Sequence, residues 1–130
     1  MQKILELKIP IRIISEANTG FSLRNPKMTW VRLKKRKEEQ KNAIWKHWIA
    51  NGHEAYQIEP RCHVKLIRIA PRQLDDDNLA YAFKHIRDTI SDLIKPGMAK
   101  GRADSKDITF EYAQEKGKVK EYGIKIEVYS

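Results

Sequence analysis

Apolar and polar residues alternate strictly near the start of the chain. A period of two is typical of a strand that buries one face, and Pro10 within this segment indicates an edge strand or a bulge. Residues 15–25 are rich in loop-forming residues and are expected to end the strand. The apolar positions that share one parity are Leu5, Leu7, Ile9, Ile11 and Ile13.

A long helix is predicted from about residue 26 to residue 50. Asn25 can cap it, Pro26 suits its first turn, and Gly52 just beyond it is a common C-terminal signal. Residues 34–41 form a charged block, typical of a solvated face or, alternatively, of a surface that faces DNA. Three tryptophans in this segment are expected to make core or subunit contacts rather than to stack on bases: Trp30, Trp45 and Trp48.

A second strand is predicted from Arg61, because apolar and polar residues alternate up to Leu66. A turn around Pro71 follows, and then a helix over residues 77–94 that ends before Pro96. One side of this helix forms an apolar stripe that should face the core. Its members are Leu79, Phe83, Ile86, Ile90 and Leu93.

Two more strands close the chain, over residues 108–112 and 122–128, and the loop 114–120 is expected to join them as a hairpin. The predicted order is strand, helix, strand, helix, strand, strand. A mixed β-sheet with two main helices packed on one face would bury every apolar stripe. The sequence therefore predicts a single α+β domain over residues 1–130.

The chain is strongly basic, with a net charge of +9 and a pI near 9.7. Such a charge favours a polyanionic partner, although excess lysine can also serve solubility alone. Cys62 is the only cysteine, which excludes an intrachain disulfide and suits a reducing compartment. No apolar run approaches the roughly 20 residues needed to span a bilayer, and the N-terminus lacks a signal-peptide pattern. We therefore expect an intracellular protein without a membrane partner.

An acidic run, Asp75-Asp76-Asp77 followed by Asn78, interrupts this basic sequence at the predicted strand-to-helix junction. Asp and Asn cap helices and interact favourably with the positive helix end, so capping alone is one explanation. In an extended turn, however, Asp75 and Asp77 would point the same way and could share a cation. Mg²⁺ prefers oxygen ligands, often one or two carboxylates with waters. The run therefore predicts either a cap or a metal site at which water could be activated for attack on a phosphate.

A polar face of the predicted second helix supplies a further candidate. At about 100° per residue, Lys84 and Asp88 fall within roughly 20° of Asp77 around a straight helix, away from the apolar stripe. A solvated surface is one interpretation of this face. The other places the Lys84 ammonium near a phosphate bound at the acidic run.

The stretch RIAPRQLDDDNL, residues 68–79, resembles the RusA-like endodeoxyribonucleases, a family of Holliday junction resolvases. That family carries Asp-x-Asp-Asn at a strand-to-helix junction, and Asp75, Asp77 and Asn78 match this motif. The family has a further essential acid in the loop before the next strand. The stretch GRADSKDITF, residues 101–110, is similar to that region, so the resemblance assigns the third acid to Asp104, with Asp107 in reserve.

The resemblance implies a Mg²⁺-dependent homodimer, with Mn²⁺ as an alternative metal, that resolves four-way DNA junctions by paired nicks. Asp75, Asp77 and Asp104 would bind the metal, and Lys84 would lie near the scissile phosphate. Junction resolution implies a role in DNA recombination and repair. Many members are encoded by phages or prophages, which implies the cytoplasm of a bacterial or phage-infected cell. The chain departs from the family at Tyr81, where a lysine is frequent, and in its longer loop before the third acid.

Two other functions are compatible with the same residues. The chain could be a non-catalytic basic module that binds nucleic acid, with the acidic run serving only as a helix cap. It could also be a nuclease that acts on forks, flaps or plain duplex rather than on four-way junctions. Metal-dependent cleavage separates the first alternative from the nuclease interpretation, and substrate preference separates the second.

Overall fold

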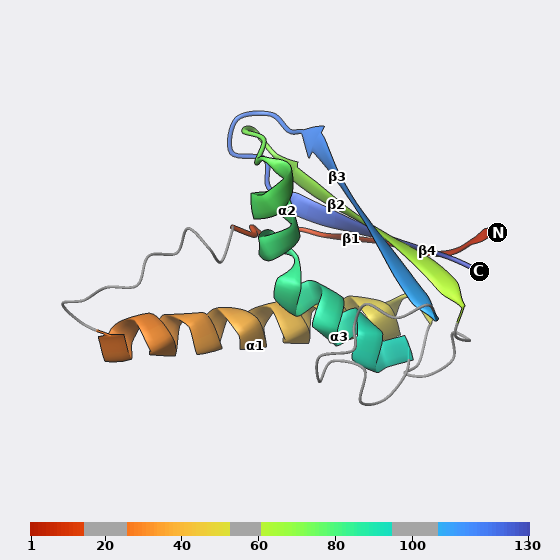
Figure 1. Cartoon of the computed structure of the whole chain (residues 1–130), viewed down its shortest axis with the longest axis horizontal. Helices are drawn as coiled ribbons and strands as arrows, with labels where there is room; N and C mark the ends of the chain where they lie inside the picture. The colour runs from red at the N-terminus through yellow and green to blue at the C-terminus, as the bar shows by residue number, and fades with distance from the viewer. Residues whose placement is uncertain (15–25, 53–60, 95–106) are drawn as a thin grey trace.

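The computed structural model describes residues 1–14, 26–52, 61–94 and 107–130, with residues 26–29 described only as helix (Figure 1). It confirms the predicted α+β class, with a mixed sheet and helices. The elements are β1 (Lys3–Ile9), α1 (Pro26–Ala50), β2 (Cys62–Ala70), α2 (Asp76–Ala82), α3 (Lys84–Ile94), β3 (Ile108–Lys116) and β4 (Gly123–Tyr129).

The sheet has four strands in the order β1-β4-β2-β3. β2 pairs in parallel with β3 and antiparallel with β4, and β4 pairs antiparallel with β1. The predicted hairpin of the last two strands is therefore wrong, because β2 lies between them. A parallel pair such as β2 and β3 needs a long crossover, which α2 and α3 lie within. The β3–β4 connection passes the end of β2, where the Gly117 N–H donates to the carbonyl oxygen of Ala70 at 2.9 Å.

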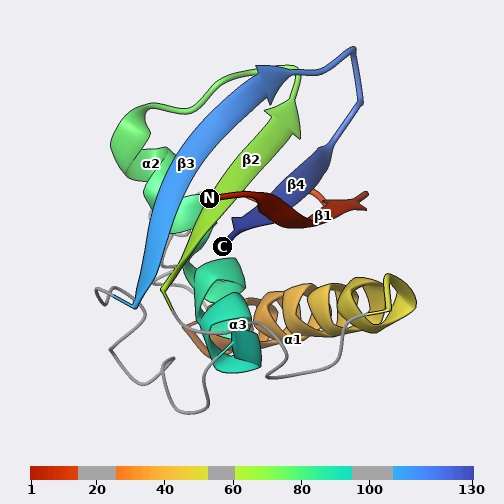
Figure 2. The same ribbon diagram turned by 90° about the vertical axis from the view of Figure 1, so that its right-hand side faces the viewer.

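The helices lie on one face of the sheet (Figure 2) and share one apolar core with it. The predicted parity of the first strand is confirmed, since Leu5, Leu7 and Ile9 are buried in that core. The opposite face carries charged side chains that pair across strands, for example Lys65 with Glu111 at 3.6 Å. Among the described helices, none is both long enough and apolar enough to cross a membrane. The buried residues of the helices are chiefly Ile44, Trp48, Leu79, Phe83, Ile86, Ile90 and Leu93.

The tryptophans of α1 have different environments. Trp48 is fully buried in the core, and Trp45 packs against it while remaining partly exposed. Trp30 is 65% exposed, and the Lys34 ammonium lies 5.8 Å from the centre of its ring. The expectation of a core role is thus confirmed for Trp48, while Trp30 has a large exposed apolar surface.

Phe83 separates α2 from α3. Its φ and ψ of −93° and 4° leave the helical region, and its N–H is shared between the carbonyl oxygens of Leu79 and Ala80 at 3.3 and 3.2 Å. The Phe83 ring is fully buried and stacks on Tyr112, with ring centres 5.9 Å apart. The prediction of one continuous helix over residues 77–94 is wrong at this residue, although the apolar stripe is buried as predicted.

Candidate functional site

The acidic run lies just beyond the end of β2, where a turn over residues 71–74 leads into α2. Two side chains on the helical side of the sheet hold this turn. Arg68 donates from Nη1 to the carbonyl oxygen of Arg72 at 2.7 Å. Gln114 on β3 accepts from the Leu74 N–H at 2.8 Å and donates from Nε2 to the Leu74 carbonyl oxygen at 2.7 Å. The residue before Asp75 is therefore fixed to the sheet on both its backbone groups.

Asp75 caps α2. Its backbone is extended, with φ −70° and ψ 167°, and its Oδ1 accepts from the Asn78 N–H at 2.9 Å. This is the arrangement that an N-terminal cap requires, so the capping interpretation of Asp75 is confirmed. A capping carboxylate has a second oxygen, and no described residue donates a hydrogen bond to Oδ2 of Asp75. Capping thus leaves one oxygen of Asp75 for a ligand.

Asp76 and Asp77 occupy the first turn of α2, and both are exposed. The premise of an extended turn, in which Asp75 and Asp77 would point the same way, is therefore wrong for Asp77. Residues two apart in a helix do not face each other. The two carboxylates share the exposed end of α2, and among the described residues no group of three or more acids, histidines or cysteines could hold a metal ion.

Of the two candidates for the third acid, only Asp107 lies among the described residues. Asp104 lies outside the described residues, so its relation to Asp75 and Asp77 stays a prediction. The reserve candidate, Asp107, precedes β3, and its carbonyl oxygen accepts from the N–H groups of Arg61 and Cys62 at the start of β2. β2 has nine residues and spans about 26 Å, so Asp107 lies at the opposite end of the sheet from Asp75. The structure does not bring Asp107 together with the acidic run.

Lys84 begins α3, beyond the break at Phe83. Most of α2, about 10 Å along the helix axis, separates it from Asp77. The straight-helix argument that put Lys84 and Asp88 on the face of Asp77 is wrong, because the helix is interrupted between them. Asp88 experiences the charge of Lys37 on α1, so this part of α3 faces α1. Lys84 itself is exposed.

Burial raises the pKa of the Asp88 carboxyl, and the positive charges of Arg87, His85, Lys84 and Lys37 offset this only in part. A carboxyl with a raised folded-state pKa destabilises the fold when it is ionised. We therefore expect Asp88→Asn to raise the free energy of unfolding at neutral pH. The gain should disappear as the pH falls through the folded-state pKa, and chemical denaturation over a pH series measures it. A loss of stability that is the same at every pH would contradict this explanation.

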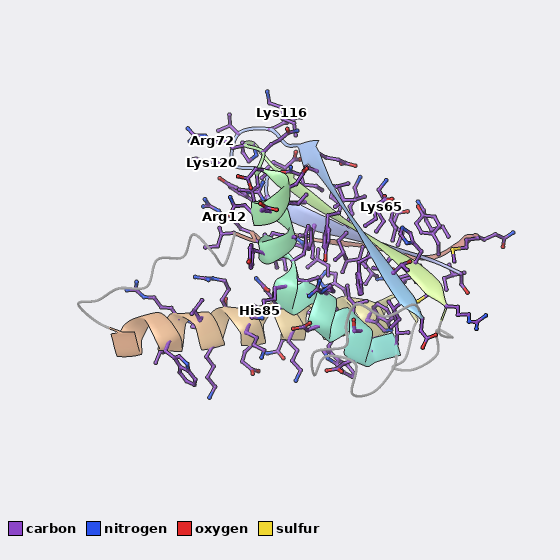
Figure 3. The ribbon with its side chains drawn as sticks, in the orientation of Figure 1. Arg12, Lys65, Arg72, His85, Lys116 and Lys120 are labelled. Carbon is purple, nitrogen blue, oxygen red and sulfur yellow. The ribbon has the colours of Figure 1, made fainter. Side chains whose placement is uncertain are left out.

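A basic cavity of about 640 Å³ adjoins the acidic run. It runs from the turn over residues 71–74, of which it includes Leu74, to the β3–β4 connection and the segment after β1. Figure 3 shows Arg72, Lys116 and Lys120 gathered at the end of the sheet where α2 begins, with Arg12 next to them. No acidic residue is among the described residues that line the cavity: Arg12, Ile14, Arg68, Ala70, Pro71, Arg72, Leu74, Val119, Lys120 and Tyr122.

Sequence reasoning missed Gln114 and Arg68 as positioning residues. Gln114 falls within the segment expected to be a hairpin loop, whereas β3 extends to Lys116 and brings its amide against Leu74. Arg68 stands at the start of the stretch 68–79, and the sequence alone gives it no role of its own. The alternation along β2 and β3 could have revealed both residues, because Arg68 and Gln114 have the same parity as the buried residues of their strands. The two residues pair with each other across the sheet.

Gln114→Leu removes both hydrogen bonds to Leu74 while keeping the side-chain volume similar. A partly buried backbone group that loses its partner costs about 1–3 kcal/mol, so we expect the free energy of unfolding to fall within that range. The turn before Asp75 should loosen, and hydrogen exchange at the Leu74 amide should accelerate. Gln73→Leu, an exposed substitution one residue from Leu74, is the control. Unchanged exchange at Leu74 in the Gln114 variant would contradict the positioning role.

Comparison of the chain with known proteins identified no relative. No family model matches the chain, and searches among curated proteins and solved structures found no match either.

Proposed function

We propose that the protein is a Mg²⁺-dependent endonuclease that cuts branched DNA, with the four-way junction as its preferred substrate. The observation that carries this proposal is the juxtaposition of two exposed carboxylates, Asp75 and Asp77, with a cavity lined by basic side chains. Metal-dependent hydrolysis of a phosphodiester uses both: anionic ligands for the metal and cationic groups for the phosphates on either side of the cut.

The residues present fit a Mg²⁺ site that the substrate completes. Mg²⁺ is usually held by one or two carboxylates, with waters and substrate phosphate oxygens as the other ligands. Oδ2 of Asp75 would supply one carboxylate oxygen, Asp77 at the same exposed end of α2 would supply a second, and Asp104 is proposed as a third ligand. A bound Mg²⁺ would supply Lewis-acid stabilisation of the phosphate and lower the pKa of the attacking water. The hydrogen bonds of Arg68 and Gln114 fix the turn that presents Asp75.

Lys84 has only a secondary role in this proposal, as a contact to a phosphate away from the cut. Its ammonium can serve a phosphate only if the DNA extends along α2 towards α3, because about 10 Å of helix separates it from Asp77. The basic residues of the cavity lie nearer to Asp75 and take over the role of holding phosphate.

The protein would act in DNA recombination and repair, in the cytoplasm of a bacterial or phage-infected cell.

The test is a cleavage assay with and without Mg²⁺ on four substrates of equal arm length: four-way junction, replication fork, flap and linear duplex. We expect symmetric nicks in the junction that require Mg²⁺ or Mn²⁺ and disappear with a chelator. Cleavage of forks or flaps in preference to junctions would retain a nuclease and reject the resolvase. Binding without cleavage of any substrate would reject the nuclease.

The alternative of a non-catalytic nucleic-acid-binding module rests on one observation, the cap at α2. Asp75 has a structural role there that needs no metal. Asp76 and Asp77 would then only interact with the positive end of α2. This alternative leaves the basic cavity in place and predicts DNA binding without Mg²⁺-dependent cleavage.

Resolution of a junction by paired nicks requires two active sites, so the proposal includes a two-fold homodimer. Trp30 and Val31, which are 65% and 52% exposed, lie in the first half of α1, which reaches past α3 in Figure 1. We expect these side chains at the subunit contact and a dimer mass in light scattering at tens of micromolar. Trp30→Glu should yield monomers, whereas Lys35→Glu, at an exposed position of the same helix, should leave the dimer intact. A wild-type protein that is monomeric at this concentration would contradict the prediction.

A further inference from the structure

The guanidinium group of Arg68 is buried at the wall of the basic cavity. Arg68 is only 7% exposed, and its Nε is buried without a hydrogen-bond partner. One described hydrogen bond, from Nη1 to the Arg72 carbonyl oxygen, leaves most of its donors unused. A buried charge without an acidic partner is costly, because it loses hydration that no counter-charge replaces.

A second positive charge lies close to the first. Burial and the neighbouring Arg12 both lower the pKa of Arg68, which nevertheless stays protonated at any physiological pH. Arg12 is held over the ring of Tyr122, with the guanidinium carbon 4.4 Å from the ring centre. This contact fixes Arg12 at the cavity without neutralising it. The fold thus keeps two guanidinium groups near each other against their repulsion.

Lys120 adds a third observation. Its φ is 62°, in the left-handed region that non-glycine residues rarely adopt. This strained residue lies in the connection between β3 and β4, which brings the side chains of Lys120 and Tyr122 to the cavity. With the exposed Arg72 on the other side, four cationic side chains surround one hollow, and no described lining residue is acidic.

We propose that this cavity binds a phosphate group of the DNA backbone, next to the phosphate that is cut at Asp75 and Asp77. Arginine matches phosphate because its planar fork donates two parallel hydrogen bonds, and the unused donors of Arg68 need such an acceptor. The cavity volume lies in the range of ligand sites, which leaves room for the sugar attached to the phosphate. The location relative to the cut rests on the proposed function, whereas phosphate binding itself does not.

Binding of DNA without metal tests this inference apart from catalysis. Fluorescence anisotropy with a labelled duplex in a chelator should show roughly ten-fold weaker binding for Arg12→Gln and Arg72→Gln, the loss expected for a charge-assisted contact. The slope of log affinity against log salt should fall by about 0.9 in each. Lys65→Gln removes one charge from the opposite face of the sheet, as Figure 3 shows, and should change neither quantity. An equal loss in Lys65→Gln would overturn the assignment to the cavity.

Two further variants avoid the problem of misfolding. Arg68→Met removes an unpaired buried charge, and the relief of its desolvation cost offsets the loss of the hydrogen bond to the Arg72 carbonyl oxygen. Lys120→Gly suits the positive φ of this position. Both should fold at least as stably as the wild type and still bind DNA more weakly. Wild-type affinity in both variants would overturn the proposal.

Inorganic phosphate, used as a probe, helps to distinguish two ligands of the cavity: a phosphate of the DNA backbone and a small phosphorylated molecule. Millimolar phosphate should raise the melting temperature of the wild type and not that of Arg68→Met, because only the folded cavity binds it. Phosphate stabilisation together with reduced DNA affinity in the cavity variants supports a backbone phosphate. Phosphate stabilisation with unchanged DNA affinity would instead assign the cavity to a small phosphorylated molecule and overturn the DNA inference. Loss of cleavage plays no part in any of these outcomes.

Discussion

Asp77→Asn should reduce Mg²⁺-dependent cleavage of a four-way junction by roughly a thousand-fold or more, since an anionic metal ligand supports several kcal/mol of transition-state stabilisation. The substitution keeps the side-chain size, and Asn is tolerated in the first turn of a helix. Asp77 is exposed, so the fold should persist. DNA binding should persist or become tighter, because one negative charge near the phosphates is removed. Single-turnover cleavage, measured beside anisotropy in a chelator, separates these effects.

Asp76→Asn is the matched control, since Asp76 lies next to Asp77, is also exposed and has no assigned ligand role. It should cleave at close to the wild-type rate. Asp75→Asn is a second informative variant, because Asn caps helices as well as Asp does and the bond to the Asn78 N–H survives. Cleavage should collapse in this variant without loss of stability. Full cleavage in both Asp75→Asn and Asp77→Asn would leave the acidic run with capping alone.

The class of the fold could be predicted because the apolar pattern has a clear period in each element. In β1 the alternation of Leu5, Leu7 and Ile9 specified which face is buried. In α2 and α3 the stripe through Leu79 and Ile90 specified the core side even though the helix is broken between them. Burial of one face is a local property that a single segment reveals.

The order of the strands could not be predicted in the same way. Both β3 and β4 alternate, but nothing in either segment says that β2 lies between them. The loop between them resembles a hairpin loop in composition, and only the crossover from β2 to β3 decides otherwise. The break at Phe83 is equally hidden, because no proline or glycine marks it and the stacking on Tyr112 involves residues distant in sequence.

The candidate site likewise has one part that could be predicted from the sequence and one part that could not. The strand-to-helix position of Asp75 and its cap follow from the order of residues along the chain. The convergence of Arg12, Arg68 and Lys120 on one cavity does not, because these residues come from three separate segments. The count of basic residues predicted a polyanionic partner, and the fold adds the location at which several of these charges meet beside the acidic run.

Affinity for DNA should fall steeply as salt rises, whatever the shape of the DNA. A protein that neutralises roughly six to ten phosphates loses about 10³- to 10⁵-fold in affinity between 50 and 200 mM salt. The net charge of +9 on each chain makes losses of this order our expectation. The term depends on released counterions and treats linear duplex and junction arms alike, so at low salt the protein should bind both.

A junction differs from duplex in geometry rather than in charge. A dimer with two basic cavities can hold two arms of a four-way junction at once, and the second contact is then intramolecular, with a high effective concentration. A junction held at both cavities neutralises more phosphates than a duplex held at one, so its affinity depends more steeply on salt. The preference for junction over duplex of equal length should therefore be largest at low salt and shrink as salt rises, and Mg²⁺-dependent cleavage should follow it. Titrations of both DNAs at a series of salt concentrations measure this ratio. Equal affinities throughout the series would reject the resolvase, and the cleavage assay would then decide between a general nuclease and a binding module.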